Sequence, residues 1–295
     1  MRLILPALAL CAAPATALES EPFRPATADE QSARAAVSIA DYRFDDLLWE
    51  NDRIAFRIYG RQLEKAEPPS SSGVDAWGKR VRWPFMERQL RTGDQHADHG
   101  EGLDFYNVGT GRGTGGLGIW YDNKLWTSRN YVRPRILHSG GDVADFTVDY
   151  EPWPVDVLRT VRETRRFTLR AGTNFTRMTS TITSNSDADL IVAIGISKRP
   201  ISGGRLGDVR KDSAGARLSW WGPADGDKGR MAAAVIVDPA SFAGFAEDAD
   251  NYLALVRVRP GRPFVYYSGA AWDRGGDFAT REAWNSYVDA QRPDF

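Results

Sequence analysis

The sequence predicts an all-β protein, built as a large antiparallel sandwich with one short helix near its C-terminal end. Three observations favour this class. Many segments alternate apolar and polar residues with the two-residue period of a strand, the chain holds 28 glycines that can end strands at turns, and only one segment has clear helical spacing. Long irregular connections, such as Leu63 to Gln95, favour a sandwich over a closed barrel.

The clearest strand pair runs from Val157 to Arg170 and from Phe175 to Thr183, joined by the turn Ala171 to Asn174. In the first strand the apolar residues Val157, Val161, Phe167 and Leu169 share one parity, and threonines and arginines fill most of the other. This alternation predicts a strand with one face in the core and one face in water.

Further segments rich in β-branched and aromatic residues predict more strands. They are Arg53–Tyr59, Leu117–Tyr121, Val143–Tyr150, Leu190–Ser197, Ala232–Val237, Tyr252–Val258 and Phe264–Ser268. Residues 280–291 predict the single helix, because Trp284, Tyr287 and Val288 share one side and Thr280 can cap the first turn.

The N-terminal region predicts processing and export. Residues 1–17 combine one early positive charge, a short apolar run and a small-residue end, which is the pattern of a cleaved signal peptide. We expect residues 18–35 to form a flexible leader and residues 36–295 to form a single domain. The mature protein is then exported, periplasmic or secreted, and it has no disulfide because the only cysteine, Cys11, lies in the signal.

Composition limits the classes of partner. The apolar run of the signal is too short to span a membrane, so we expect no membrane span. The formal net charge of −1 gives no basic field for nucleic acid, so we expect no nucleic-acid partner. The oligomeric state is left open by the sequence.

One short segment concentrates side chains that move protons or bind metals. It contains His96, Asp98, His99, Glu101, Asp104 and Tyr106. Folding alone gives a surface loop no reason to collect such residues, which predicts a functional site. Histidine titrates near neutral pH, so His96 or His99 could abstract a proton while Tyr106 supplies another.

The same segment has two other interpretations. His96, Asp98, His99 and Glu101 could hold a divalent metal ion, since imidazole and carboxylate are ordinary ligands, although their spacing matches no established helix-borne zinc motif. No cofactor is otherwise indicated. The plainer alternative is a hydrogen-bonded polar loop without a ligand.

Basic and aromatic residues elsewhere predict a substrate-binding surface. Aromatic platforms beside cations that hold a carboxylate are how proteins bind acidic sugars. The candidates are Trp77, Lys79, Arg80, Arg135, Tyr266 and Trp272.

Several motifs resemble an uncharacterised family of exported bacterial proteins, grouped with galactose-mutarotase-like proteins and associated with polysaccharide degradation. The matching stretches are residues 49–60 (WENDRIAFRIYG), 73–80 (GVDAWGKR), 96–106 (HADHGEGLDFY), 115–116 (GG) and 266–272 (YYSGAAW). The resemblance implies a β-supersandwich with a sugar-binding cleft, and related enzymes include polysaccharide lyases, epimerases and oligosaccharide dehydratases.

Together the residues and the resemblance favour β-elimination on an acidic, uronate-containing oligosaccharide. A base removes the C5 hydrogen, a cation or metal stabilises the resulting charge, and the group on O4 leaves with a proton. Loss of a sugar defines a lyase and loss of water a dehydratase. Three alternatives remain: a non-catalytic carbohydrate-binding protein, an epimerase or mutarotase, and a glycoside hydrolase that uses Glu101 and Asp104.

Overall fold

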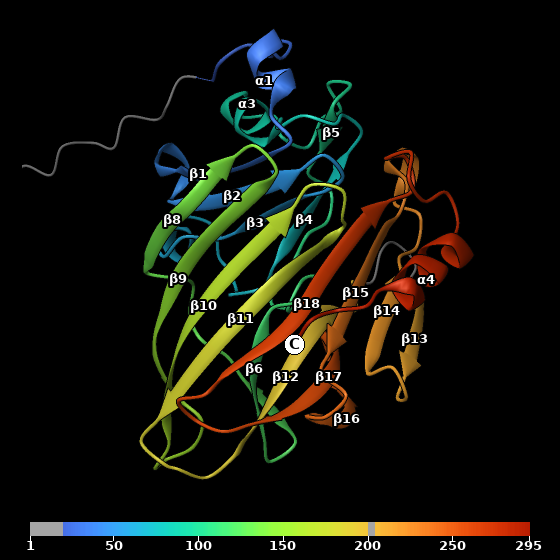
Figure 1. Ribbon diagram of the computed structural model, residues 1–295. Helices are drawn as coiled ribbons and strands as arrows, with labels where there is room; N and C mark the ends of the chain where they lie inside the picture. The colour runs from blue at the N-terminus through green and yellow to red at the C-terminus, as the bar shows by residue number, and fades with distance from the viewer. Residues whose placement is uncertain (1–19, 200–203) are drawn as a thin grey trace, which may run out of the picture.

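The computed structural model describes residues 20–199 and 204–295, and these residues form three antiparallel sheets layered around a common core (Figure 1). The predicted signal peptide, residues 1–17, lies outside the described residues. The prediction of an antiparallel all-β sandwich with a short C-terminal helix is confirmed.

The largest sheet has eight strands in the order β13-β14-β15-β18-β11-β10-β9-β8. In chain order they are β8 Arg133–Gly140, β9 Val143–Pro154, β10 Thr160–Arg170, β11 Phe175–Ser184, β13 Asp208–Asp212, β14 Arg217–Trp221, β15 Met231–Val237 and β18 Pro263–Trp272.

Two five-stranded sheets complete the layers. One has the order β1-β2-β3-β4-β5, with β1 Ala35–Ala40, β2 Asp46–Asn51, β3 Ala55–Ile58, β4 Asp75–Lys79 and β5 Gly102–Leu103. The other has the order β16-β17-β12-β6-β7, with β6 Leu117–Tyr121, β7 Lys124–Trp126, β12 Leu190–Ser197, β16 Phe242–Glu247 and β17 Asn251–Val258.

The helices are short and lie at the periphery of the sheets (Figure 1). They are α1 Ala28–Ser32, α2 Leu63–Ala66, α3 Met86–Arg91 and α4 Arg281–Ala290, with one-turn 3₁₀ helices at Asp41–Arg43 and Gly226–Lys228. Helix α1 belongs to the leader, where Thr27 and Glu30 form a reciprocal capping box. Among residues 20–199 and 204–295, no helix is long and apolar enough to cross a membrane.

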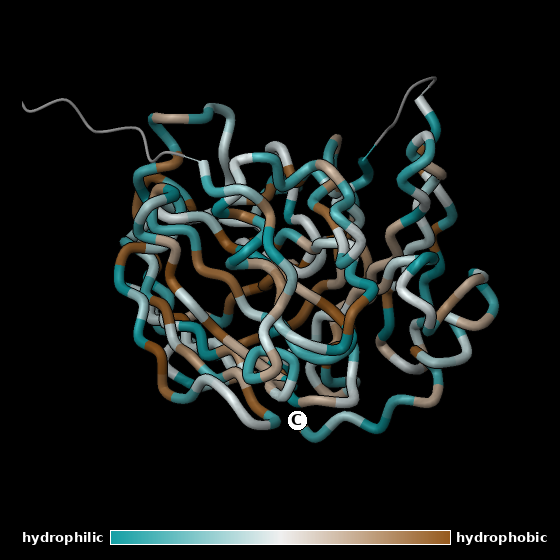
Figure 2. The backbone as a smooth tube through the Cα atoms, turned by 90° about the horizontal axis from the view of Figure 1, so that it is seen from above, coloured by the Kyte–Doolittle hydropathy of each residue, from teal (hydrophilic) through white to brown (hydrophobic). Residues whose placement is uncertain are grey.

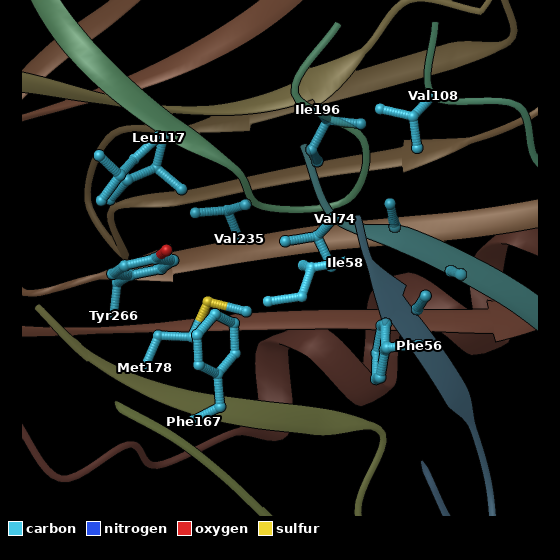
Figure 3. Close-up of a cluster of buried hydrophobic side chains, with 14 of the residues drawn as sticks. Phe56, Ile58, Val74, Val108, Leu117, Phe167, Met178, Ile196, Val235 and Tyr266 are labelled. Carbon is cyan, nitrogen blue, oxygen red and sulfur yellow. The ribbon is translucent and has the colours of Figure 1, made fainter. Parts of the chain in front are cut away.

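One hydrophobic core receives side chains from all three sheets. In Figure 3, Ile58 of β3 lies beside Met178 of the large sheet, and Phe56, Phe167 and Tyr266 belong to the same buried cluster. Figure 2 shows hydrophobic segments running through the middle of the molecule, between the layers. The layers are therefore held together mainly by burial of apolar surface.

The strand predictions agree with the structure except at their ends. Strand β10 alternates exposed and buried residues along its length, as its sequence predicts, and Thr280 caps α4 through a hydrogen bond from the backbone of Ala283. The predicted start of β10 at Val157 is wrong, because Val157 and Leu158 lie in the β9–β10 connection and are 98% and 81% exposed.

Candidate functional site

A pocket of about 440 Å³ opens beside β3, and the loop from Gln95 to Gly109 forms much of its wall. Strand β3 and the residue after it contribute Arg57 and Tyr59. The charged and titratable side chains of the wall are Arg43, Arg57, Tyr59, Glu67, His96, Asp104, Tyr106, Arg199, Asp225 and Lys228. Of the predicted catalytic residues, His96 and Tyr106 line this pocket and His99 does not.

His96 is held in one orientation by the loop that carries it. Its Nδ1 lies 2.8 Å from the backbone carbonyl oxygen of Asp104, which can only accept a hydrogen bond. Nδ1 therefore carries the proton, and the lone pair of the neutral ring is on Nε2, 3.2 Å from the side-chain amide of Gln95. The side chain is 62% exposed, so Nε2 can exchange protons with a bound molecule.

The carboxylate of Asp104 lies 3.9 Å from Nδ1 of His96. The same carboxylate oxygen accepts a hydrogen bond from Arg57 at 2.8 Å, so Asp104 contacts both the ring of His96 and the guanidinium behind it. The geometry therefore suits a general base: Nδ1 is oriented by the Asp104 carbonyl, and Nε2 accepts a hydrogen bond from the Gln95 amide that a substrate would replace.

Arg57 holds the carboxylate of Asp104 in place through a buried ion pair. Its Nη2 donates to Asp104 at 2.8 Å and to Asp75 at 2.9 Å, and its Nε donates to the same oxygen of Asp75 at 3.1 Å. Burial and the neighbouring Asp104 carboxylate raise the pKa of Asp75 to about 7. Because Arg57 joins β4 to the loop that carries His96, it organises the floor of the pocket.

Tyr59 is a second proton-carrying group in the wall. Its hydroxyl donates to Asp75 at 3.0 Å, and the guanidinium of Arg57 lies over its ring at 5.0 Å. Burial raises the pKa of Tyr59 well above its usual range, so the hydroxyl keeps its proton at neutral pH. A phenol that is protonated and faces a pocket can serve as a proton donor.

The pocket wall also contains two cations that form no ion pair among the described residues. Arg43 pairs with Glu67 at 2.7 Å, whereas Arg199 and Lys228 form no ion pair within the described part of the chain. Both are half-buried, and the guanidinium of Arg199 lies over the ring of Tyr106 at 5.6 Å. The unpaired charges of the wall are therefore two cations and one carboxylate, that of Asp225, which leaves a net positive charge in the pocket.

The residues proposed as metal ligands do not converge. Asp98 forms a two-point ion pair with Arg80, and Glu101 accepts hydrogen bonds from Arg88 and Trp83. Within residues 20–199 and 204–295, no three histidine, cysteine, aspartate or glutamate side chains gather closely enough to hold a metal ion. Both carboxylates are already neutralised by arginine, so this set does not fit a divalent ion.

His99 packs against the N-terminal leader and not into the pocket. Its ring stacks on Phe23 of the leader, with ring centres 4.9 Å apart, and its Nε2 lies 3.9 Å from Asp94. The leader therefore packs against the loop at this point.

Glu101 and Asp104, the pair considered for a glycosidase, do not share the pocket, because only Asp104 lines it.

The hydroxyl of Tyr106 is engaged inside the protein. It donates to the backbone carbonyl of Gly113 at 3.0 Å, and the residue is only 3% exposed. Burial raises its pKa, so the hydroxyl stays protonated but is already committed to a backbone partner. Tyr59 also donates its hydroxyl to a partner, Asp75, but it is half-buried rather than buried and is therefore the more accessible tyrosine of the pocket wall.

Two of the predicted substrate-binding residues on β4 are buried. Trp77 is 0% exposed and donates to Asp75 at 3.3 Å. Lys79 donates to Glu50 at 2.5 Å and to the carbonyl of Trp83 at 2.6 Å. Neither side chain is accessible to a sugar; both support the strand.

The remaining predicted binding residues are spread over the fold. Tyr266 is buried in the core (Figure 3), and its hydroxyl donates to the carbonyl of Gly115. Arg135 is exposed on β8 and is absent from the pocket wall. Arg80 lies over the ring of Trp272 at 4.9 Å.

Trp272 supports the pocket indirectly. Its Nε1 donates to the carbonyl of Lys228 at 2.8 Å, which fixes the turn that carries the Lys228 cation. The contribution of Trp272 is therefore to position a neighbouring cation rather than to offer a stacking surface.

Sequence reasoning missed Arg57, Tyr59, Arg199 and Lys228. A signal existed for Arg57, because a charged residue within an otherwise apolar strand indicates a buried ion pair. Arg199 and Lys228 lie far from His96 in the sequence and carry no such signal.

Comparison with known proteins identifies the family of this chain. A family model described as "Domain of unknown function (DUF4861)" matches residues 13–294. The chain belongs to the DUF4861 family. A relative, "Uncharacterized protein P7" from Formosa agariphila, is 27% identical over 262 residues, which cover 83% of this chain and 64% of that protein's length.

Two solved structures resemble this DUF4861 chain more remotely. The GH36 alpha-galactosidase AgaB from Geobacillus stearothermophilus has 9% identity and a TM-score of 0.40, over 80% of this chain and 41% of that one. The 4-alpha-glucanotransferase from Thermococcus litoralis has 8% identity and a TM-score of 0.35, over 82% of this chain and 40% of that one. The chain thus spans about two fifths of the length of each.

Proposed function

We propose that the pocket beside β3 binds an acidic, uronate-containing oligosaccharide and catalyses β-elimination on it. One observation carries the proposal: the Nε2 lone pair of His96, engaged by the Gln95 amide alone, lies on a pocket where Arg199 and Lys228 have no carboxylate partner among the described residues. A proton acceptor beside two available cations is the combination that abstraction of a hydrogen next to a carboxylate requires.

In the proposed reaction, Arg199 and Lys228 bind the substrate carboxylate. His96 Nε2 takes the C5 hydrogen as a proton, and the electron pair of that bond forms the C4–C5 double bond as the C4–O4 bond breaks. The departing oxygen receives a proton from the Tyr59 hydroxyl, which exchanges its hydrogen bond to Asp75 for one to that oxygen. Loss of a sugar makes the enzyme a lyase, and loss of water makes it a dehydratase.

The cations have two roles in this scheme. They bind the ground-state carboxylate, and they stabilise the additional negative charge that develops on it when the C5 proton leaves. Asp104 contributes separately, because its backbone carbonyl orients the ring of His96 so that Nε2 faces the substrate.

The test is to incubate the protein with uronate-ended oligosaccharides, with and without a chelator, and to follow ultraviolet absorbance and product mass. A new conjugated double bond with loss of water identifies a dehydratase, and a shortened oligosaccharide with the same chromophore identifies a lyase. An altered C5 configuration without a double bond identifies an epimerase, and intact but tightly bound oligosaccharide identifies a binding protein.

A pair of histidine variants tests the role of the base. We expect His96→Gln to lower turnover by about 100-fold or more, the usual contribution of a general base. His138→Gln is the matched control, because His138 is exposed on β8 and lies outside the pocket wall. An unchanged product profile for His96→Gln would remove His96 from the mechanism.

A further inference from the structure

A second cavity lies on the outer face of the eight-stranded sheet. Its volume is about 520 Å³, and it shares no wall residue with the pocket beside β3. Strands β10, β11, β18 and β15 form its floor, and the segment from Gln291 to Asp294 borders it. Figure 1 shows this segment returning from α4 across the outer side of β18.

The register of the sheet aligns the floor residues in one row. Thr168 pairs with Arg177, Arg177 pairs with Tyr267, and Tyr267 pairs with Ile236. These four residues point away from the core, because the alternate residues on the same strands, such as Met178 and Tyr266, are buried in it. Directly paired side chains in a sheet are close enough to bind one ligand together.

Arginines surround this row. Arg166 and Arg170 lie two residues on either side of Thr168 on β10, and Arg292 approaches from the segment after α4. Together with Arg177, the wall holds four guanidinium groups and one carboxylate, that of Asp294.

Most of these guanidinium groups have no acidic partner. Arg166 pairs with Asp145 at 2.5 Å. Arg177 donates to the hydroxyl of Thr179, and Arg292 donates to backbone carbonyls. In the part of the chain that the structure describes, Arg170, Arg177 and Arg292 form no ion pair within 4.0 Å.

The floor also has an apolar component. Phe175 packs its ring over Gly269, where a β-carbon would lie 2.6 Å from the ring, and Tyr267 is half-buried beside it. The Tyr267 hydroxyl donates to the backbone carbonyl of Asp294 at 2.8 Å, which holds the bordering segment in place. A cavity with guanidinium groups above apolar and aromatic surface suits a sugar ring that carries an anionic group.

We propose that this cavity is a second, non-catalytic binding site for an anionic oligosaccharide, one that bears carboxylate or sulfate groups. Like charges on neighbouring strands repel one another, so an arginine cluster of this kind is stabilised when a polyanion occupies it. The site lies apart from the pocket beside β3, and its assignment does not depend on the β-elimination proposed there.

Calorimetric titration tests this proposal on the full chain carrying Arg199→Ala, which weakens anion binding in the first pocket. The probes are a uronate oligosaccharide, a sulfated oligosaccharide and a neutral oligosaccharide of the same length. The test variant adds Arg170→Ala and Arg177→Ala. The matched control adds Arg162→Ala, because Arg162 is exposed on the same face of β10 but does not line the cavity.

We expect the test variant to bind at least one of the anionic probes about tenfold more weakly or worse, because charge-assisted hydrogen bonds are lost. The control should bind as before, and higher salt should weaken binding in both. The two anionic probes distinguish a carboxylate ligand from a sulfate ligand.

Equal binding of the neutral probe, or equal affinity of the test and control variants, would overturn the proposal. Thermal unfolding of each variant shows whether a loss of affinity follows from a loss of structure. Turnover is measured separately on the chain with Arg199 intact. If turnover is absent but binding at the second cavity is retained, only the proposed β-elimination is contradicted. If turnover is present but the test and control variants bind equally well, only the second site is contradicted.

Discussion

The buried ion pair between Lys79 and Glu50 tests whether Lys79 supports the fold or binds substrate. Lys79 Nζ lies 2.5 Å from the Glu50 carboxylate and 2.6 Å from the carbonyl oxygen of Trp83. The residue is only 2% exposed. Burial lowers the pKa of Lys79, although the Glu50 carboxylate opposes this effect. In the variant Lys79→Met, Glu50 would remain buried without its cation.

Removing one partner of a buried ion pair costs about 3–5 kcal/mol of folding free energy. Glu50 keeps two hydrogen bonds from the backbone N–H groups of Phe85 and Met86, each 2.9 Å long. We therefore expect Lys79→Met to cost about 3 kcal/mol, the lower end of that range. For a domain of this size, the loss lowers the midpoint of thermal unfolding by roughly 6 °C.

Circular dichroism measures this midpoint, and calorimetry measures substrate affinity well below it. The double variant Lys79→Met/Glu50→Gln is the control, because it removes both charges and should recover part of the lost stability. An unchanged midpoint of thermal unfolding together with lost substrate affinity would refute the structural role of Lys79 and would indicate that Lys79 binds substrate.

Three further substitutions have defined outcomes. Tyr106→Phe should cost about 1–2 kcal/mol in chemical denaturation, because the carbonyl of Gly113 loses its donor, while turnover stays unchanged; lost turnover at full stability would contradict this. Burial raises the pKa of Asp46 to about 6, so its contribution to stability is lost as pH rises from about 4 to about 6. Asp46→Asn should flatten the pH dependence of the free energy of unfolding in that window and stabilise the protein at pH 7. An unchanged dependence of the unfolding free energy on pH would contradict the raised pKa of Asp46. Gly102→Ala should cost about 2 kcal/mol or more, because the residue has a φ of +152° and the new β-carbon would lie 2.1 Å from the carbonyl oxygen of Gly78; an unchanged denaturation midpoint would contradict this.

The sequence predicts the large sheet better than the smaller ones for a physical reason. Strand β10 has one face in the core and one in water, so its residues alternate, and the period is visible. Strand β2, Asp46–Asn51, is buried on both faces and shows no alternation, so it was missed. Strand β8 was missed for the opposite reason, because most of its residues are exposed at the sheet edge.

The candidate site was predicted in part. The segment from His96 to Tyr106 does contribute to the pocket, but its titratable residues point to different partners. Adjacency in the sequence therefore overestimated their proximity in space. Arg199 and Lys228 could not be found by pattern, because only the folded arrangement of three sheets brings their loops to His96.

Asp104 connects the chemistry of the pocket to its structural support. Its backbone carbonyl orients His96, its carboxylate lies 3.9 Å from the same ring nitrogen, and Arg57 holds that carboxylate at 2.8 Å. The backbone N–H of Asp104 in turn donates to the carbonyl of Gln95, the residue whose amide faces His96 Nε2. The loop thus closes on itself around the imidazole, and β3 anchors it through Arg57. A side chain that is 62% exposed keeps one orientation under these constraints, which is what proton transfer to a bound sugar requires.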